Sequence, residues 1–339
     1  MKAKFSTRVN GARDKLSDVL PLQVPFSMFI DVSNACNFKC KFCALHYSDK
    51  KMAFKKMCMD YEVFKKIIDD IKGFSHPLKM LKLQGFGEPL LNKNLANMIQ
   101  YAKDAQVSDW IETVTNASLL TPALNRDLIA AGLNRICISI EAIDPEGYAW
   151  MSGVKLNWEK FVDNIRDFYE NRKQCEVYIK IVDAAVEKEE QKEKFFSVFG
   201  DISDQIFIEH INPVWPEFDE INDNFELDQQ EGVYGNKIED VEICPFPFYS
   251  CVVNSDGEVT VCCVDWERKI SMGNAIAENI CDIWHGDKYH QFLINMLEKG
   301  RKGYKSAICA KCNYPCYNHM DSLDNDRYLV LEKIKKGLL

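Results

Sequence analysis

Several features that would assign this chain to a simple class are absent from its sequence. Among its 339 residues, no apolar run approaches the roughly 18 residues that a membrane-spanning helix needs. The N-terminal stretch MKAKFSTRVNGARDKLSDVL lacks the continuous apolar segment of a secretory signal. We therefore expect a cytoplasmic protein with no membrane-bound part, in a compartment where cysteines stay reduced.

Positive charge is also in short supply. Lys and Arg together number 42 against 51 for Asp and Glu, which gives a formal net charge of −9. This balance argues against a nucleic-acid partner bound over the whole surface. Hydrophobic residues make up 47% and charged residues 27%, and this ordinary composition excludes a disordered or fibrous chain.

Cysteine is too scarce for a disulfide scaffold but unevenly distributed. The 14 cysteines among 339 residues fall well below the roughly 8–10% that marks small disulfide-rich domains. Three of them lie within 36–43, and eight lie between 244 and 316. Such grouping is typical of thiols that bind a metal ion or an iron–sulfur cluster.

Between residues 26 and 210, β-branched apolar runs alternate with segments of helical period. The predicted strands are 25–32, 78–84, 110–115, 135–140, 176–182 and 205–210, and the predicted helices are 61–74, 95–105, 121–132, 157–172 and 189–200. This alternation indicates right-handed βαβ units and a parallel sheet, either doubly wound or curved into a partial barrel. The chemistry is then expected in the loops that follow the strands.

The remainder of the chain has a different pattern. Residues 211–243 are acidic and have no clear period, so they are predicted to bridge two domains. Residues 248–263 predict a β-hairpin whose turn is Asn254–Gly257. Helices are predicted at 278–285, at 287–299 and in the tail. The expected division is an N-terminal extension, an α/β domain, the bridge, a cysteine-rich domain and a C-terminal helix, at 1–25, 26–210, 211–243, 244–320 and 321–339.

The first cysteine group has a distinctive spacing. Cys36, Cys40 and Cys43 follow the first predicted strand as C-x3-C-x2-C. A tight loop of this kind can turn three thiolates toward one 4Fe–4S cluster, which leaves the fourth iron open to a small molecule. Zinc is the alternative. It normally takes four ligands, and His46 could complete such a set.

This loop and the six predicted strands resemble the radical S-adenosylmethionine (SAM) enzymes. The resemblance covers residues 26–210 and implies a partial (β/α)6 barrel of the TIM-like kind. It implies that the open iron binds SAM, and that an external donor such as flavodoxin or ferredoxin reduces the cluster. Reductive cleavage of SAM then gives a 5′-deoxyadenosyl radical. Phe42 stands where the family pattern has an aromatic residue before the third cysteine.

The resemblance also implies SAM-binding residues at the ends of the predicted strands. Gly87 and Glu88 lie in the sequence Gly-Phe-Gly-Glu-Pro, which is similar to the family's glycine–glutamate motif, although Phe86 stands where the family usually has another glycine. The further SAM-binding candidates are Thr115, Asn116, Ser139 and Glu141, with Lys180 and Asp183 as weaker ones. Taken alone, the glycine motif is only a turn, and a carboxylate after a strand is often a helix cap.

The C-terminal cysteines resemble a second feature of the same family, the SPASM or twitch extension. The resemblance implies that an auxiliary 4Fe–4S cluster is held by Cys244, Cys262, Cys309 and Cys312. The alternative ligands are Cys251, Cys263 and Cys316. Because successive strand residues face opposite ways, only one of the neighbours Cys262 and Cys263 is expected to face the cluster. A zinc ribbon formed by the same four cysteines is the other interpretation.

These features together imply a radical SAM oxidoreductase of the dehydrogenase or epimerase type. The hypothesis is hydrogen abstraction from a small polar, sugar- or aminoglycoside-like substrate, with the auxiliary cluster supporting oxidation or epimerisation. The short segment 1–25 disfavours a fused peptide-binding domain, so modification of a ribosomal peptide is the second hypothesis. A non-catalytic iron–sulfur or zinc protein is the third. No catalytic residue is identified, and His210 and Tyr47, which could line the substrate cavity, are the candidates; the bridge is a candidate lid.

Overall fold

The strands of the protein form a single curved sheet. A computed structural model describes residues 1–8, 14–47, 54–213, 225, 230–303, 307–318 and 321–337, except the side chains of residues 46, 47 and 307. In this part, ten strands pair in the order β1-β7-β6-β5-β4-β3-β2-β8-β9-β10. They are β1 (Lys4–Phe5), β2 (Ser27–Ile30), β3 (Met80–Lys82), β4 (Ile111–Thr115), β5 (Arg135–Ile140), β6 (Glu176–Val182), β7 (Gln205–Glu209), β8 (Ser250–Val253), β9 (Glu258–Thr260) and β10 (Ser271–Asn274).

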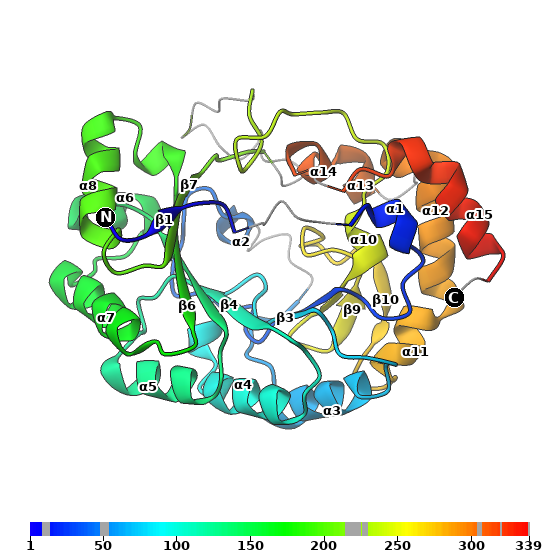
Figure 1. Cartoon of the computed structure of the whole chain (residues 1–339), viewed down its shortest axis with the longest axis horizontal. Coiled ribbons are helices and arrows are strands. Elements are labelled where there is room, and N and C mark those ends of the chain that lie inside the picture. The colour runs from blue at the N-terminus through cyan, green and yellow to red at the C-terminus, as the bar shows by residue number, and fades with distance from the viewer. Residues whose placement is uncertain are drawn as a thin grey trace.

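Strands β2 to β7 are the six predicted strands, and every pairing among them is parallel. The sheet bends into an open ring with helices outside it, which is the predicted partial barrel (Figure 1). The sequence was also compatible with a doubly wound sheet, but the curvature of the observed sheet is that of a partial barrel. The short strand β1, which was not predicted, extends the ring by pairing with β7.

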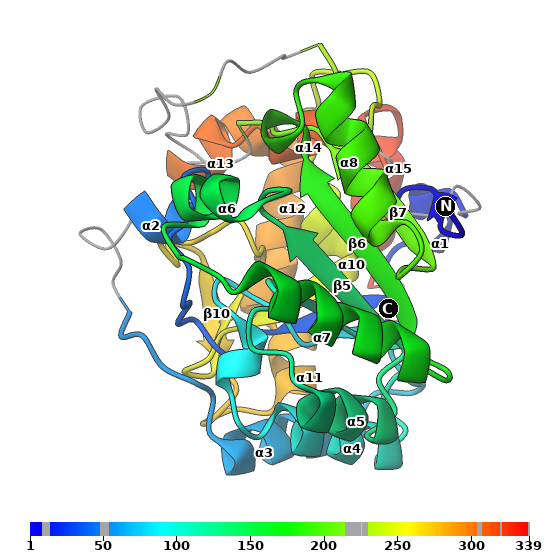
Figure 2. The same ribbon diagram turned by 90° about the vertical axis from the view of Figure 1, so that its left-hand side faces the viewer.

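The predicted helices cover the outer face of this ring. They are α3 (Tyr61–Ile71), α4 (Leu95–Asp104), α5 (Pro122–Ala130), α7 (Trp158–Asn171) and α8 (Glu189–Phe199), and Figure 2 shows α5, α7 and α8 outside β5 and β6. Side chains cap the starts of α3, α5 and α7: in α5, for example, the Thr121 side chain accepts the Leu124 N–H at 3.2 Å and Pro122 follows it.

One helix of the barrel, α6 (Pro145–Ser152), was not predicted. Its signals are local: the Asp144 side chain accepts the Gly147 N–H at 2.8 Å, and Gly153 ends the helix with a φ of +70°. The helix has only eight residues, and a glycine in its first turn weakens the periodic signal. Helix α6 matters for function, because it contacts the first cysteine loop.

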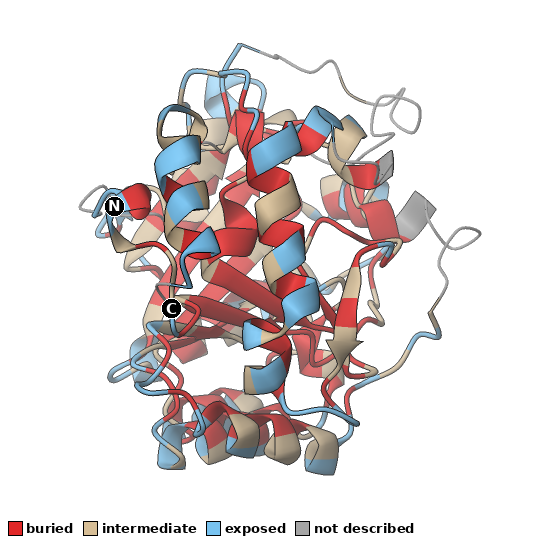
Figure 3. Ribbon diagram, turned by 90° about the vertical axis from the view of Figure 1, so that its right-hand side faces the viewer, coloured by how far each residue is buried: buried red, intermediate tan, exposed pale blue. Residues whose placement is uncertain are grey.

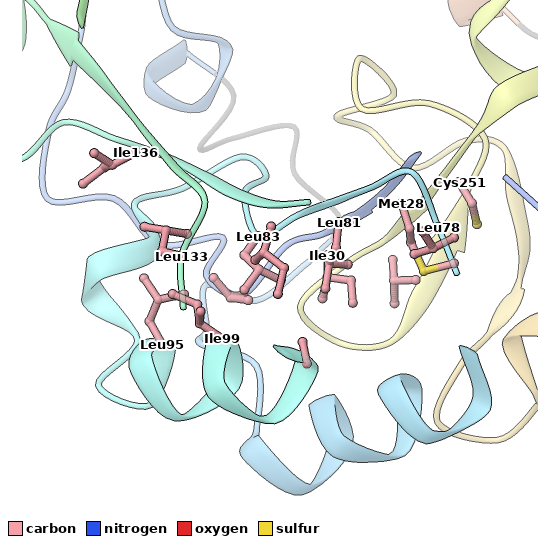
Figure 4. Close-up of a cluster of buried hydrophobic side chains, with 14 of the residues drawn as sticks. Met28, Ile30, Leu78, Leu81, Leu83, Leu95, Ile99, Leu133, Ile136 and Cys251 are labelled. Carbon is pink, nitrogen blue, oxygen red and sulfur yellow. The ribbon is translucent and has the colours of Figure 1, made fainter. Parts of the chain in front are cut away.

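The two faces of the barrel strands differ in polarity. Leucines and isoleucines at alternate positions point outward, and Figure 4 shows Leu81 and Leu83 above Leu95 and Ile99 of α4. Most residues of β2 and β4 to β7 are buried, while the outer faces of the helices are exposed (Figure 3). The residues between these apolar positions, among them Lys82 and Glu112, therefore face the inside of the ring.

The C-terminal segment continues the same sheet rather than starting a separate one. Strand β8 pairs in parallel with β2, and Ser27 Oγ lies 3.0 Å from Ser250 Oγ across this pairing. Strands β8 and β9 are antiparallel, as the predicted hairpin requires. The helices that follow are α11 (Ile280–His285), α12 (Asp287–Gly303), α13 (Ala307–Lys311), α14 (Tyr314–Tyr317) and α15 (Arg327–Lys335), while α10 (Phe246–Tyr249) precedes β8.

The N-terminal segment around residues 15–17 packs against the start of the C-terminal helix. Asp326, just before α15, accepts hydrogen bonds from Lys15 Nζ and Ser17 Oγ, both at 3.0 Å. Of the predicted bridge 211–243, residues 214–224 and 226–229 lie outside the described residues. None of the helices described is long and apolar enough to span a membrane.

Candidate cluster and cofactor sites

The first cysteine loop follows β2, as predicted, and helix α6 supports it. Its backbone N–H groups at Lys39 and Lys41 donate to the carbonyls of Ser152 and Met151 at 2.8 and 3.0 Å. These carbonyls lie at the end of α6, where they have no partner within the helix. The unpredicted helix therefore positions the loop that carries the three cysteines.

The three thiols of this loop are half-buried neighbours. The N–H of Cys43 donates to the Cys40 carbonyl at 3.0 Å, and the Phe38 N–H donates to the sulfur of Cys36 at 3.4 Å. Burial is the main influence that raises the pKa of Cys36 to about 12, and it raises the pKa of Cys40 further. Thiolates are thus disfavoured in the free protein, so loading of a metal cluster would release protons.

The glycine–glutamate motif docks directly on the chain that leads into this loop. A Cβ atom on Gly87 would lie 2.2 Å from the Ala35 carbonyl oxygen, so only glycine allows this approach. The Glu88 N–H donates to the same Ala35 carbonyl at 2.8 Å. The motif and the cysteine loop therefore form one unit.

Glu88 joins this unit to the end of β4. Its side chain is buried, and it accepts hydrogen bonds from Leu90 N at 2.9 Å, Thr115 Oγ1 at 2.6 Å and Asn116 N at 2.8 Å. Burial raises the pKa of Glu88, and these three hydrogen bonds oppose the rise. The structure thus brings three of the predicted SAM-binding residues together. Glu88 is also the N-cap of the short helix η2 (Pro89–Leu91), which is the structural role that a carboxylate after a strand often has.

Phe86, the departure from the family pattern, has its own partners. Its ring stacks on Phe54, with ring centres 5.9 Å apart and an angle of 18° between the planes. The Arg268 guanidinium lies 3.9 Å above Phe54 on the side of the C-terminal segment. Arg268 in turn pairs with Asp256 at the hairpin turn. A stack of side chains therefore connects the hairpin to the glycine–glutamate motif.

The candidates on β5 and β6 lie at the same edge of the barrel. Burial raises the pKa of Glu141 to about 7, against the opposing influence of Lys180, and the thiol of Cys40 hydrogen-bonds to it. Ser139 is paired in register with Lys180. Lys180 Nζ lies 2.5 Å from Glu209 Oε2. Glu141 is therefore in contact with the cysteine loop, while Lys180 is committed to an ion pair.

His210 is held between two carboxylates. Its Nδ1 lies 2.9 Å from Asp183 Oδ2, and its Nε2 lies 3.1 Å from Glu231 Oε2. Both ring nitrogens are thus engaged, and the histidine ties residue 231 to the end of β7. The other cavity candidate, Tyr47, lies in α2 (Ala44–Tyr47), and its side chain falls outside the described residues, as does that of His46. Phe42 contacts Phe225 edge-on at 6.5 Å.

Four cysteines of the second group are electrostatic neighbours. The thiols of Cys309 and Cys312 both act on Cys244, and those of Cys244 and Cys312 act on Cys262, although the four come from three separate segments. Burial is the main cause that raises the pKa of Cys309 to about 12 and that of Cys312 to about 11. Four mutually influencing, half-buried thiols are the residue type and number that a cubane cluster takes as ligands, although they do not converge around one point.

The three alternative ligands have different surroundings. Cys251 is fully buried on the outward side of β8, and Figure 4 shows it among apolar side chains. Cys316 accepts a hydrogen bond from Arg301 Nη2 at 3.0 Å. Cys263 hydrogen-bonds to Cys262, because β9 ends at Thr260 and the alternation expected of a strand no longer separates these neighbours. Among the described residues, no three His, Cys, Asp or Glu side chains converge around a single ion.

Arg301 organises the second group, and sequence reasoning did not find it. The side chain is buried and donates to the carbonyls of Val241 and Cys312, both at 2.5 Å. Gly300, with a φ of +65°, breaks α12 just before it and lets the arginine turn inward. The sequence signal that could have indicated this buried arginine is the pair Gly300-Arg301 near the end of an amphipathic helix.

Two family models match this chain. The model described as the radical SAM superfamily matches residues 30–198, and the SPASM model, described as an iron–sulfur cluster-binding domain, matches residues 244–313. The chain belongs to the radical SAM superfamily. Its two domains imply a SAM-binding 4Fe–4S cluster and auxiliary cluster binding, as predicted.

Relatives of this radical SAM chain span most of its length. It is 24% identical over 289 residues to the S-adenosyl-L-methionine-dependent 2-deoxy-scyllo-inosamine dehydrogenase of Niallia circulans, covering 85% of this chain and 93% of the relative. It is 23% identical over 326 residues to the tungsten-containing aldehyde ferredoxin oxidoreductase cofactor-modifying protein of Pyrococcus furiosus, covering 84% and 86%.

Solved structures show the same fold. The structure of BtrN in complex with AdoMet and 2-DOIA matches with a TM-score of 0.56 and 21% identity, covering 86% of this chain and 93% of BtrN. Native anSMEcpe with bound AdoMet matches with a TM-score of 0.58 and 17% identity, covering 91% and 99%. These likenesses confirm the radical SAM barrel with its C-terminal extension.

The inside of the radical SAM barrel holds charges that sequence reasoning missed. Glu112 on β4 is 1% exposed and lies within 4 Å of three cations, Arg8, Lys82 and Arg135. The signal was present in the strands themselves. In both LKL (81–83) and IET (111–113) a charged residue alternates with apolar ones, which marks one polar face.

Proposed function

We propose that this radical SAM enzyme is an oxidoreductase that removes a hydrogen atom from a carbon of a small, sugar- or aminocyclitol-like substrate. When bound, SAM and the clusters supply reductive cleavage to a 5′-deoxyadenosyl radical and an acceptor for the electron left on the substrate. Net oxidation of an alcohol then releases one hydrogen atom, one proton and one electron. The similarity to a 2-deoxy-scyllo-inosamine dehydrogenase over nearly the whole chain supports the substrate class.

The observation that supports the proposal most strongly is that the first cysteine loop, the Gly87–Glu88 turn and the end of β4 are joined by hydrogen bonds. Cys36, Cys40 and Cys43 are proposed to ligate the SAM-binding cluster, and the docked Gly87–Glu88 turn holds the adjoining backbone. Glu88 fixes Thr115 and Asn116 beside it, so the edge that faces SAM is rigid before SAM binds.

The second cysteine group is proposed to hold the auxiliary cluster through Cys244, Cys262, Cys309 and Cys312. Because β8 continues the barrel sheet beside β2, this group is attached directly to the strand that leads into the first cysteine loop. The two clusters would therefore flank the inside of the barrel. The proposed domain limits are 26–210 and 244–320, and flavodoxin or ferredoxin is the proposed electron donor.

An anaerobic assay tests the proposal. Reconstituted protein, SAM and dithionite are incubated with 2-deoxy-scyllo-inosamine, with a panel of sugars, and with no substrate. We expect 5′-deoxyadenosine in all samples and more of it, together with an oxidised product, in the presence of one compound class. Cleavage of SAM stimulated only by peptides would favour the second hypothesis, peptide modification. Absence of SAM cleavage in cluster-loaded protein would contradict the proposal.

A further inference from the structure

One carboxylate inside the barrel, that of Glu112, has three cationic neighbours. Arg8 Nη1 and Lys82 Nζ lie 3.9 and 3.6 Å from the same Glu112 oxygen, and Arg135 Nη1 lies 3.7 Å from the other oxygen. Arg135 also has a close partner of its own, Glu176, at 2.8 Å. Within the described residues, Glu112 is therefore the carboxylate within 4 Å of both Arg8 and Lys82, and Glu209 acts on Arg8 from farther away.

These three side chains are largely buried, where a charge is energetically costly. The side chains of Arg8 and Lys82 are only 19% and 17% exposed, and Glu112 is 1% exposed. Burial lowers the pKa of Lys82, and Arg8 lowers it further, while Glu112 opposes both. Two cations that repel each other inside a protein are destabilising unless a second anion completes the set.

The two cations are brought there by elements that no motif covers. Arg8 follows β1, the short strand that pairs with β7, and the chain after β1 turns toward the middle of the ring in Figure 1. Its guanidinium is influenced first by Tyr234, and then by Glu112, Cys137 and Glu209, which come from β4, β5 and β7. Lys82 is on β3. Arg8 thus reaches across the barrel to meet Lys82 from the opposite side.

A buried hydroxyl group lies near Arg8 and Glu209. The Tyr178 residue on β6 is 1% exposed, and its phenol oxygen has no hydrogen-bond partner within the part of the chain that the structure describes. Arg8 and Cys137 are among its electrostatic neighbours. A buried phenol of this kind is normally satisfied by a polar partner. The barrel therefore offers two cationic donors and one hydroxyl to the same region.

We propose that Arg8 and Lys82 form a binding site for an anionic group of the substrate, with Tyr178 as an adjoining hydrogen-bond partner. The proposal rests on the proposed function and narrows it to sugar-like molecules that carry a phosphate or a carboxylate. The anion would pair with the two cations that now share Glu112. A site of this kind would favour an anionic substrate over an aminocyclitol that carries only positive charge.

The test measures binding of matched probes by calorimetry, with reconstituted holoenzyme and SAM but no reductant. The probes are glucose 6-phosphate, glucuronate, glucose and glucosamine. We expect at least one anionic probe to bind about tenfold or more tightly than glucose, a difference of about 1.4 kcal/mol. Preference for the phosphate alone or the carboxylate alone identifies which anion the site takes. Equal binding of all four, tighter binding of glucosamine, or no binding overturns the proposal.

Variants assign the preference to the two residues. Lys82→Met and Arg8→Gln should each remove most of the anion preference, while Lys82→Arg should retain it. The matched control is Lys79→Met. Lys79 is exposed, lies over the ring of Phe26 and precedes Lys82 by three residues, and its replacement should leave the anion preference unchanged. Iron content is measured in each variant. Lys82→Met protein that loses iron but keeps its anion preference would show that the charge serves the auxiliary cluster, and this overturns the proposal.

A SAM-cleavage assay on the same preparations separates this inference from the proposed function. Holoenzyme that cleaves SAM but shows no anion preference contradicts only the anion site. Holoenzyme that cannot cleave SAM contradicts the proposed function itself, whatever the probes do.

Discussion

The two cysteine groups of this chain are assembled in different ways. The first comes from eight consecutive residues, 36–43, and is held by backbone hydrogen bonds that it donates to α6 and by the docked Gly87 turn. The second comes from three segments and depends on one buried arginine, Arg301. A cluster site formed by one short segment can be recognised from the spacing of its cysteines, and it should tolerate substitutions elsewhere in the chain. A site assembled from several segments forms only when the fold brings them together, so it should be lost when that packing is lost.

The largest effect that tests this contrast is loss of the first group. Replacing Cys36, Cys40 and Cys43 with Ala should reduce bound iron from about eight to about four atoms per chain, by the count of two 4Fe–4S clusters. SAM cleavage should disappear, because the remaining cluster has no open iron. Iron analysis and 5′-deoxyadenosine quantification check both results. Zinc without iron in the unmodified protein would contradict the assignment.

Arg301→Met should destabilise the second group selectively. Its loss leaves buried carbonyls of Val241 and Cys312 without their donor, which costs about 1–3 kcal/mol for each buried acceptor left unsatisfied. We expect auxiliary iron to fall while SAM cleavage persists. The control is Arg166→Met, an exposed arginine paired only with Asp163, which should leave iron content and melting temperature unchanged. Equal loss of both clusters would mean that the two groups are not independent.

Glu88→Ala should weaken SAM binding without removing iron. A charge-assisted hydrogen bond is worth about 1.5–3 kcal/mol, so affinity should fall roughly tenfold to a hundredfold. The structure adds a second consequence, because Asn116 N and Leu90 N lose their acceptor and the protein should melt at a lower temperature. Equilibrium binding and thermal melting measure the two effects. Unchanged SAM affinity in folded, cluster-loaded protein would place the SAM site elsewhere.

Phe86→Gly is expected to have the smallest effect. It restores the glycine that the family usually has, but it removes a stack on Phe54 worth about 0.5–1.5 kcal/mol. SAM affinity should change by less than about tenfold, and iron content should stay the same. Phe86→Tyr, which keeps an aromatic ring, is the control. A loss as large as that of Glu88→Ala would make the stack a main determinant of the SAM site.

Much of the barrel could be predicted because its signals are periodic. All six strands β2 to β7 and five outer helices follow from alternating apolar residues and caps such as Thr121. Helix α6 and strand β1 were missed because they are short, and their stability comes from tertiary contacts: Lys2 and Ala3, for example, bond to Gly200. Short elements of this kind carry too few residues for a period to show.

The candidate site was predictable where ligands are contiguous and not where they converge. The spacing of Cys36, Cys40 and Cys43 pointed to a cluster, and the family models agree with that domain. Nothing in the sequence says that Arg8 and Lys82 meet at Glu112, because their distance depends on closure of the sheet. The pairing of β8 with β2 was invisible for the same reason.

The central claim is that the two cysteine groups have separate roles, and the double variant Cys309→Ala, Cys312→Ala tests it most directly. The measurement is the ratio of 5′-deoxyadenosine to oxidised product, made after circular dichroism and iron analysis show a folded protein that keeps about four irons. The account predicts that SAM cleavage continues and that oxidised product is lost, because the substrate radical has no electron acceptor. Full product yield would contradict the account and make the second group structural.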